Sequence, residues 1–234
     1  NNAYTWSFGQ DGYLANSMLN VGDNNISLII ENLNNSCKDT IENNIEIFEI
    51  PEIDFLVEDV CLNEPSIFID NSSNNIVDWL YDFGDGIGSS VNQNSSYFYQ
   101  DAGVYDVSLS VVSDKGCEST LNKQITIYSL PSTIFNVASD ICLGDEVNIS
   151  YFLDVPVMSC NYSFGDGYFS NEQNPTHIYD SVGVFDIALE VVSLQGCKND
   201  TVMSSIIETH NYPKVDFQAS KIFASEFSPE ISFY

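Results

Sequence analysis

Arginine is absent from the sequence, and only six lysines accompany 34 acidic residues, which gives a formal net charge of −28. Such a chain repels the phosphates of nucleic acids and the anionic surface of a membrane. The acidic residues are scattered among Asn, Ser and Thr, which indicates a solvated surface more than a dedicated cation trap. We therefore expect no nucleic-acid partner and no insertion of this segment into a membrane.

Long apolar runs are also missing, since no stretch approaches the roughly 18 residues that a membrane-spanning helix needs. The opening residues NNAYTWSFGQ lack the basic and apolar regions of a secretion signal. Either a targeting segment has been removed or the sequence is an internal piece of a longer protein.

Catalytic motifs are absent as well. No Gly-x-Ser-x-Gly, His-Glu-x-x-His or Gly-x-x-x-x-Gly-Lys-Ser/Thr pattern occurs. The two histidines, His177 and His210, are the side chains that could act as bases at neutral pH, and we expect both to be structural or solvated. The sequence therefore predicts a protein that is not an enzyme and that needs no cofactor.

What the sequence does contain is an internal repeat. Hydrophobic residues make up 44% of the chain, enough for packed cores in one to three domains. Landmarks of the first copy recur about 80 residues later, with a one-residue difference in a loop. The matching pairs include Cys61 and Cys142, Phe83 and Phe164, Tyr99 and Tyr179, and Cys117 and Cys197.

This register predicts four segments. Residues 52–131 and 132–213 form complete units, whereas residues 1–51 are the back of an earlier unit and residues 214–234 the front of a fourth. Each junction contains a proline, namely Pro51, Pro131 and Pro213. Proline is typical of rigid boundaries between structural units.

Short alternating segments fill each unit, and none carries a helical period for long. In the first complete unit they read IDFLV, SIFID, VDWLYDF, SYFY, VYDVSLSVV and KQITIY, separated by clusters of Asn, Ser, Asp and Gly. Six or seven strands at this spacing predict an all-β fold, namely tandem antiparallel sandwiches of the immunoglobulin type.

Each complete unit also contains the phrase Phe-Gly-Asp-Gly after a strand. An Asp-Gly pair at this place predicts a tight hairpin turn whose glycine takes a positive φ. We expect Asp85 and Asp166 to accept hydrogen bonds from the amides of that turn. Metal ligation by these carboxylates is the alternative.

The two runs WLYDFGDG and NYSFGDG, with the segments that follow them, resemble the polycystic-kidney-disease (PKD) repeat. The second unit keeps the family's NPTHIY segment, where the first has NSSYFY, and the opening segment departs further with FGQDG. The positions that match the family's hallmark are Trp79, Phe83, Gly84, Asp85, Gly86, Phe164, Gly165, Asp166, Gly167, His177 and Tyr179.

The cysteine landmarks resemble those of tandem arrays in very large secreted proteins of gliding and related Bacteroidota. That resemblance implies export by a type 9 secretion route and a non-enzymatic role in a stalk, adhesin or surface filament. It implies an extracellular or cell-surface location, with neighbouring repeats and a surface glycan or protein as partners. The alternative is an accessory spacer, or a carbohydrate- or protein-binding region, of a secreted hydrolase.

Six cysteines without a Cys-x-x-Cys spacing favour disulfides over zinc. Two pairings are open: within units, Cys61 with Cys117 and Cys142 with Cys197, or between units, Cys61 with Cys197. The loops concerned lie at opposite poles of an immunoglobulin sandwich, which speaks against pairing within units. Pairing between units would leave Cys37, Cys117 and Cys142 to find partners elsewhere. The sixth, Cys160, aligns with Trp79, and we expect a buried free thiol.

Weaker signals complete the list. Glu58 with Asp59, and Asp140 with Asp145, could gather calcium, although solvated carboxylates are the simpler interpretation. Asp followed by Ser or Thr and an aliphatic residue resembles the O-glycosylation signal of Bacteroidota, and would make acceptors of Thr40, Ser181 and Thr201.

Overall fold

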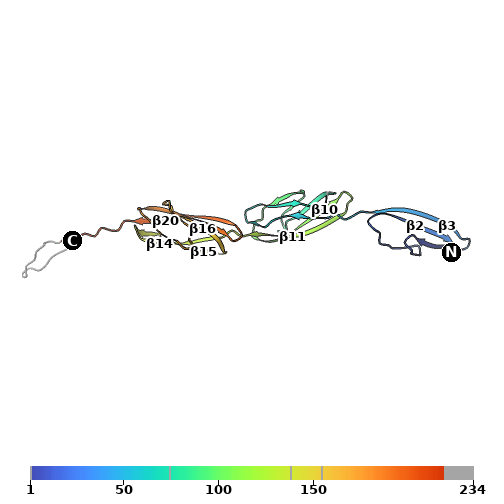
Figure 1. The fold of residues 1–234 in the computed structure, drawn as a ribbon, viewed down its shortest axis with the longest axis horizontal. Coiled ribbons are helices and arrows are strands. Elements are labelled where there is room, and N and C mark those ends of the chain that lie inside the picture. Colours follow the sequence, from blue (N-terminus) through green and yellow to red (C-terminus); the bar gives the residue numbers. More distant parts are fainter. Residues whose placement is uncertain (1, 74, 138, 154, 219–234) are drawn as a thin grey trace, which may run out of the picture. The chain divides into compact units, whose positions relative to one another are not determined.

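A computed structural model describes residues 2–73, 75–137, 139–153 and 155–218 of the chain. Every regular element in these ranges is a β strand (Figure 1). The chain separates into two compact units, Asn1–Tyr128 and Ser129–Tyr234. This boundary lies a few residues before the junction predicted at Pro131, while the further divisions predicted at Pro51 and Pro213 stay predictions.

The first unit begins with an antiparallel three-stranded sheet in the order β1-β2-β3. Its strands are β1 (Asn2–Trp6), β2 (Gly22–Asn32) and β3 (Cys37–Ile47). Nearly every residue of β3 is exposed. None of the three strands has a fully buried residue, so they contribute little to a core.

Residues 55–128 form a sandwich of two sheets. The six predicted segments each overlap one of its strands, whereas two further strands of two residues each were not predicted. One sheet has five strands and the other three. In spatial order the first consists of β5 (Val60–Cys61), β11 (Glu118–Tyr128), β10 (Gly103–Ser113), β7 (Ile76–Asp82) and β8 (Ser89–Ser90). The second consists of β4 (Phe55–Leu56), β6 (Ser66–Asp70) and β9 (Ser95–Tyr97).

The second unit repeats this plan. Its five-stranded sheet consists of β13 (Asp140–Cys142), β20 (Lys198–His210), β19 (Gly183–Ser193), β16 (Val157–Ser163) and β17 (Phe169–Ser170). The remaining strands pair as β12 (Thr133–Asn136) with β15 (Ser150–Leu153), and β14 (Glu146–Asn148) with β18 (Thr176–Ile178). The predicted all-β, immunoglobulin-like fold is confirmed.

Buried apolar residues at alternate positions of the central strands build both cores. Along β10, Val107, Leu109 and Val111 are at most 1% exposed, whereas the residues between them are half-buried. Leu189 and Val191 take the same positions on β19. Burying one such side chain contributes roughly 1.5–3 kcal/mol, so the repeated alternation fixes the register of the central strands.

A parallel strand pair lies at one edge of each five-stranded sheet. Strand β5 runs parallel to β11, with Cys61 opposite Tyr128, and β13 runs parallel to β20, with Cys142 opposite His210. The sequence predicted antiparallel strands throughout, and strands of two or three residues are too short to show a period. The chain crosses here from one sheet to the other, because β4 pairs with β6 but β5 pairs with β11.

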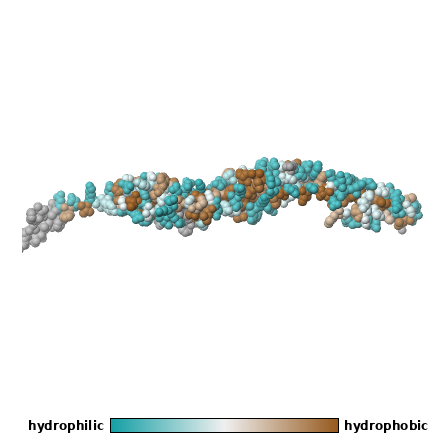
Figure 2. All heavy atoms as spheres, in the orientation of Figure 1, coloured by the Kyte–Doolittle hydropathy of each residue, from teal (hydrophilic) through white to brown (hydrophobic). Residues whose placement is uncertain are grey.

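Polar residues are interspersed with apolar ones on the face of the molecule shown in Figure 2. No helix among the described residues is long and apolar enough to span a bilayer.

Candidate functional site

The repeated Gly-Asp-Gly phrase forms the hairpin loop between β7 and β8, and again between β16 and β17. In the first, Oδ1 of Asp85 accepts hydrogen bonds from the amides of Ile87 at 2.9 Å and Gly88 at 2.8 Å. In the second, Oδ1 of Asp166 accepts from the amide of Tyr168 at 3.1 Å. One oxygen of each carboxylate is thus used to hold the turn.

The leading glycine of each phrase packs directly against a neighbouring strand. Gly84 has a φ of 80°, and a Cβ atom there would lie 2.3 Å from the carbonyl oxygen of Asp106. Gly165 has a φ of 81°, and its Cβ would lie 2.5 Å from the carbonyl oxygen of Asp186. Only glycine fits either position, which explains why both units keep the leading glycine of the Phe-Gly-Asp-Gly motif.

The second oxygen of each turn aspartate binds a ring from the opposite sheet. Oδ2 of Asp85 accepts a hydrogen bond from the Tyr97 hydroxyl at 2.5 Å, and Oδ2 of Asp166 lies 2.6 Å from Nε2 of His177. The bond to Asp85 raises the pKa of Tyr97 to about 12. Burial opposes the ionisation of Asp85, but the hydrogen bonds from Gly88, Tyr97 and Ile87 outweigh it and hold its pKa below the ordinary value.

Stacked rings continue from the turn into the core. The His177 ring lies on Phe164 with centroids 4.2 Å apart, and Tyr97 lies on Phe83 at 4.3 Å. The hydroxyl of Tyr179 donates to the carbonyl of Phe164 at 3.0 Å, and burial raises its pKa to about 12.

Trp79, Tyr99 and Gly86 complete the hallmark set. Tyr99 donates its hydroxyl to the carbonyl of Phe83 at 2.8 Å. Trp79 is half-buried and donates from Nε1 to Oδ2 of Asp70 at 2.9 Å. Gly86 and Gly167 both have positive φ, at 75° and 97°. The hallmark residues are therefore committed to turn geometry and core packing, and their polar atoms bind other protein atoms.

Of the four predicted calcium ligands, only Asp140 lies in a group of three ligand-bearing side chains within the described part of the chain. Asp59 accepts hydrogen bonds from the amide of Thr126 and the hydroxyl of Tyr128. Asp145 accepts from the hydroxyl of Tyr212, and Glu58 is exposed.

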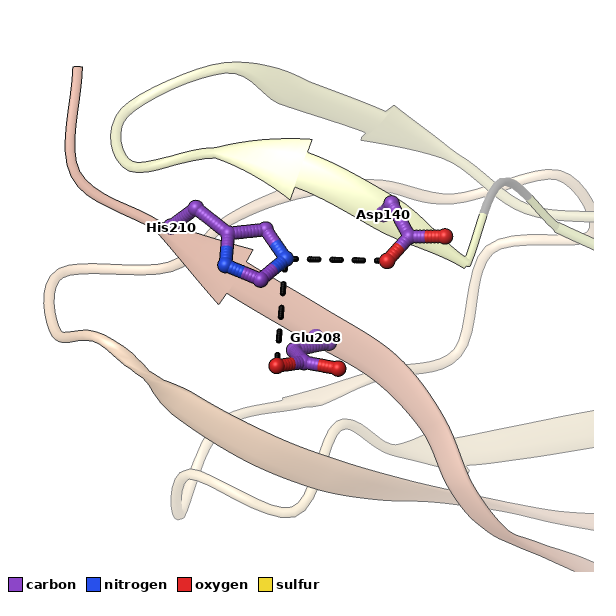
Figure 3. Close-up of side chains that lie close together, drawn as sticks. All are labelled: Asp140, Glu208 and His210. Carbon is purple, nitrogen blue, oxygen red and sulfur yellow. Dashed lines mark ion pairs between the residues drawn. The ribbon is translucent and has the colours of Figure 1, made fainter. Parts of the chain in front are cut away.

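Asp140 instead faces His210. Oδ1 of Asp140 lies 3.5 Å from Nε2 of His210, and Oε1 of Glu208 lies 3.9 Å from the same nitrogen (Figure 3). Sequence reasoning missed this group because Asp140 is far from the other two along the chain.

Comparison with known proteins decides the family. The family model described as PKD domain matches residues 51–127 and 135–207, which together make up more than half of the chain. The chain belongs to the PKD domain family.

Among relatives, the pre-pro-metalloprotease PrtV of Vibrio cholerae is 30% identical over 129 residues, which are 54% of this chain and 14% of that protein. The solved PKD1 domain of the same protease is 32% identical, covers 34% of this chain and 98% of that domain, and has a TM-score of 0.32. The PKD1 domain of Vibrio anguillarum Epp is 27% identical, covers 35% of this chain and 96% of that domain, and has a TM-score of 0.32. The chain thus spans about a seventh of the curated relative it matches.

Cysteine pairing inside a PKD unit is ruled out by the strand register. Cys117 immediately precedes β11, while Cys61 lies opposite Tyr128, the last residue of that strand. Strand β11 has 11 residues; at about 3.3 Å per residue it keeps these cysteines roughly 36 Å apart, far beyond the reach of a disulfide. The same argument separates Cys142 from Cys197 across β20. The predicted alternative of pairing within units is therefore wrong.

Cys61 and Cys197 are both disulfide-bonded, whereas Cys37, Cys117, Cys142 and Cys160 are free. Cys160 lies opposite Val191, as Trp79 lies opposite Val111, so the predicted alignment of these positions is confirmed. The Cys160 thiol is buried and lies 3.5 Å from the carbonyl oxygens of Asn171 and Glu172. Cys160 therefore packs as a small hydrophobic residue.

The three predicted glycosylation acceptors differ in exposure. Thr40 and Ser181 are exposed, whereas Thr201 is half-buried and its hydroxyl contacts that of Thr133. Attachment at all three stays a prediction, and accessibility favours the first two.

An apolar groove of about 410 Å³ lies on the β1-β2-β3 sheet. Its lining includes Trp6, Phe8, Leu19, Ile26, Leu28 and Ile41. In the PKD unit that follows, the corresponding sheet face is covered by a second sheet.

Proposed function

We propose that this chain is a non-enzymatic structural segment of an extracellular protein, in which PKD domains serve as spacers in a stalk, adhesin or surface filament. The observation that carries the proposal is the hydrogen bonding of the Gly-Asp-Gly turn that recurs in both units. Both turn aspartates are satisfied by amides and by a ring from the facing sheet. Residues so committed hold a domain together and leave no polar group for substrate chemistry.

A disulfide between Cys61 and Cys197 is the second part of the proposal. Each is disulfide-bonded, and the other four cysteines are free. Cys61 lies opposite Tyr128, the last residue of the first unit. Cys197 lies beside Asn199, whose side-chain amide donates to the carbonyl of Pro131, near the start of the second unit.

Chain length supports the same pairing. Only Ser129 and Leu130 separate Tyr128 from Pro131, and three residue steps span at most roughly 10 Å. A covalent link placed beside so short a connection would restrict the motion of one unit against the other. Repeated along an array, such links would make a stiff rod, with Cys37, Cys117 and Cys142 reserved for further neighbours.

The experiment is peptide mapping under non-reducing conditions on the parent protein recovered from the cell surface or the culture medium. We expect a peptide pair that joins Cys61 to Cys197 and a parent chain rich in further repeats. A link from Cys61 to Cys117 would overturn the rod. The double variant Cys61→Ser/Cys197→Ser should keep both folded units and lose the linked peptide, with Cys160→Ser as the matched control that keeps it.

The match to PrtV favours a second candidate, an accessory region of a secreted hydrolase. That relative is named a metalloprotease, and the PKD domains here would then hold a catalytic domain away from the rest of the molecule. Tyr168 and Phe169, which follow the second Gly-Asp-Gly turn, are 58% and 68% exposed, and in this second candidate function they would contact a carbohydrate or protein. A catalytic domain on the parent chain would decide for this function, and a parent chain made only of repeats against it.

Origin in the Bacteroidota, export by a type 9 route and a part in gliding belong to the proposal alone. They are supported by the Cys-Leu-x-Glu/Asp and Gly-Cys landmarks that recur in both units and by the exposed candidate acceptors Thr40 and Ser181. An intact mass without glycan on protein from the native host would remove the glycosylation argument.

A further inference from the structure

The outer face of β13 and β20 carries three metal-ligating side chains that converge on one point. Ligand atoms of Asp140, Glu208 and His210 all lie within 4.8 Å of one another (Figure 3). We propose that these three side chains bind a divalent transition-metal ion of the zinc class. This site is independent of the proposed spacer function, because it uses none of the turn residues or cysteines.

Strand register fixes the three residues in place. Asp140 lies directly opposite Glu208 in the parallel pair, and His210 follows Glu208 by two residues on the same face of β20. The alternate residues Ile207 and Thr209 are buried and Ile141 packs against the core. The ligand side chains therefore project outward from a backbone that is anchored on its other face.

A hydrogen bond to the far oxygen also orients Asp140. The hydroxyl of Ser139 donates to Oδ2 of Asp140 at 2.9 Å, which leaves Oδ1 as the oxygen that faces His210. Outer-shell donors of this kind orient the carboxylates of metal sites.

The first PKD unit shows the same corner without a metal-binding set. There Asp59, Thr126 and Tyr128 take the positions of Asp140, Glu208 and His210. Oδ1 of Asp59 accepts from the amide of Thr126 at 2.7 Å, and Oδ2 accepts from the hydroxyl of Tyr128 at 3.1 Å. Both carboxylate oxygens are used to close the edge of the sheet.

In the second unit a backbone carbonyl, and not the aspartate side chain, closes this edge of the sheet. The amide of Glu208, which corresponds to that of Thr126, donates to the carbonyl of Ser139 at 2.6 Å. Asp140 therefore does not accept the hydrogen bond that Asp59 accepts in the first unit. The positions of Thr126 and Tyr128 are occupied in the second unit by Glu208 and His210, whose side chains can bind metals. The structural role of the corner does not require these changes, since the first unit closes without them.

The donor set indicates the class of ion. One imidazole nitrogen with two carboxylate oxygens suits zinc and related divalent ions, and water can fill the remaining positions because the site is open. The side chains of His210, Asp140 and Glu208 are 50%, 71% and 55% exposed. A chain of net charge −28 also concentrates cations at its surface.

The two histidines make the test direct, because His210 reports on the proposed site and His177, which lies outside it, is the internal control. We would titrate the folded chain with Zn²⁺ and follow the imidazole resonances by NMR. Zinc should shift the resonances of His210 and saturate at one equivalent, while those of His177, which is held by Asp166, stay in place. Unchanged His210 resonances at millimolar Zn²⁺ would overturn the proposal and leave the group as an ion pair.

Variants test the ligand set. His210→Tyr installs the residue of the first unit and should abolish the zinc response without unfolding. Asp140→Asn and Glu208→Gln should each weaken binding at least about tenfold, the loss typical even of outer-shell changes. Cys142 lies opposite His210, so loss of binding in Cys142→Ser would overturn the assignment to the three side chains.

Discussion

Oδ2 of Asp166 lies 2.6 Å from Nε2 of His177, and at the matching place in the first unit Oδ2 of Asp85 accepts the hydroxyl of Tyr97 at 2.5 Å. The imidazole of His177 and the phenol of Tyr97 thus have the same structural role, which is to bind the turn carboxylate. Each ring stacks on the phenylalanine that opens the turn and gives its polar edge to the turn carboxylate.

Exchange of these rings should therefore be tolerated where their removal is not. His177→Tyr should change the unfolding free energy of the second unit by less than about 1 kcal/mol, because hydrogen bond and stack can both be kept. His177→Ala should cost about 2–4 kcal/mol through the lost ring and the stranded carboxylate. Urea unfolding of the whole chain gives the unfolding free energies, and hydrogen exchange identifies the transition that belongs to the second unit. Equal losses for both variants would show that the phenol does not replace the imidazole.

The two glycines of one phrase should differ in their tolerance of a methyl group. Gly84→Ala should destabilise the first unit by at least about 3 kcal/mol, since it combines a positive φ with a Cβ 2.3 Å from a carbonyl oxygen. Gly86→Ala is the matched control: its φ is 75° but no atom lies within 4 Å of the added Cβ, so the cost should be only about 1–2 kcal/mol. Thermal denaturation of both variants measures the difference in stability. If Gly84→Ala and Gly86→Ala lose similar stability, the close contact between Gly84 and the Asp106 carbonyl does not explain the need for glycine.

The first unit should lose stability in acid. Hydrogen bonds hold the pKa values of Asp54, Asp70 and Asp85 below their ordinary value. A carboxyl whose folded-state pKa is lowered contributes stability above the unfolded pKa of about 3.9, and this contribution disappears as the pH falls through the folded value. Unfolding free energy measured from pH 6 to pH 2 should therefore decline mainly below about pH 4. Asp85→Asn should flatten that decline, and an unchanged slope would remove Asp85 from the explanation.

Free thiols should react in the order of their exposure. Cys37 is exposed and should be alkylated fastest, whereas Cys160 is 8% exposed and should react only through opening of the second unit. Cys117 and Cys142 are half-buried and should fall between them. Mass spectrometry after timed alkylation gives the rates. A fast Cys160 would indicate a reactive thiol instead of a packing residue.

The sequence was informative where a pattern repeats and uninformative where contacts join distant residues. Alternation along residues 104–112 predicted β10, and the Asp-Gly pairs predicted both hairpins, because these signals are local. The two-residue strand β5 carries no period, so its parallel pairing with β11 was not foreseen. The group around His210 depends on that same kind of pairing in β13 and β20. A reader of the sequence sees the residues but not the register that unites them.

The parallel edge pair also determines how a PKD unit responds to tension. Strands β5 and β11 run in the same direction, and β11 carries the chain out of the sandwich. A pull on the two ends of the unit draws β5 backwards and β11 forwards, so the hydrogen bonds between them are loaded along the strands and must break together. Forced unfolding depends on the rate of crossing that barrier more than on equilibrium stability. A strand of two residues can in this way act as a mechanical clamp.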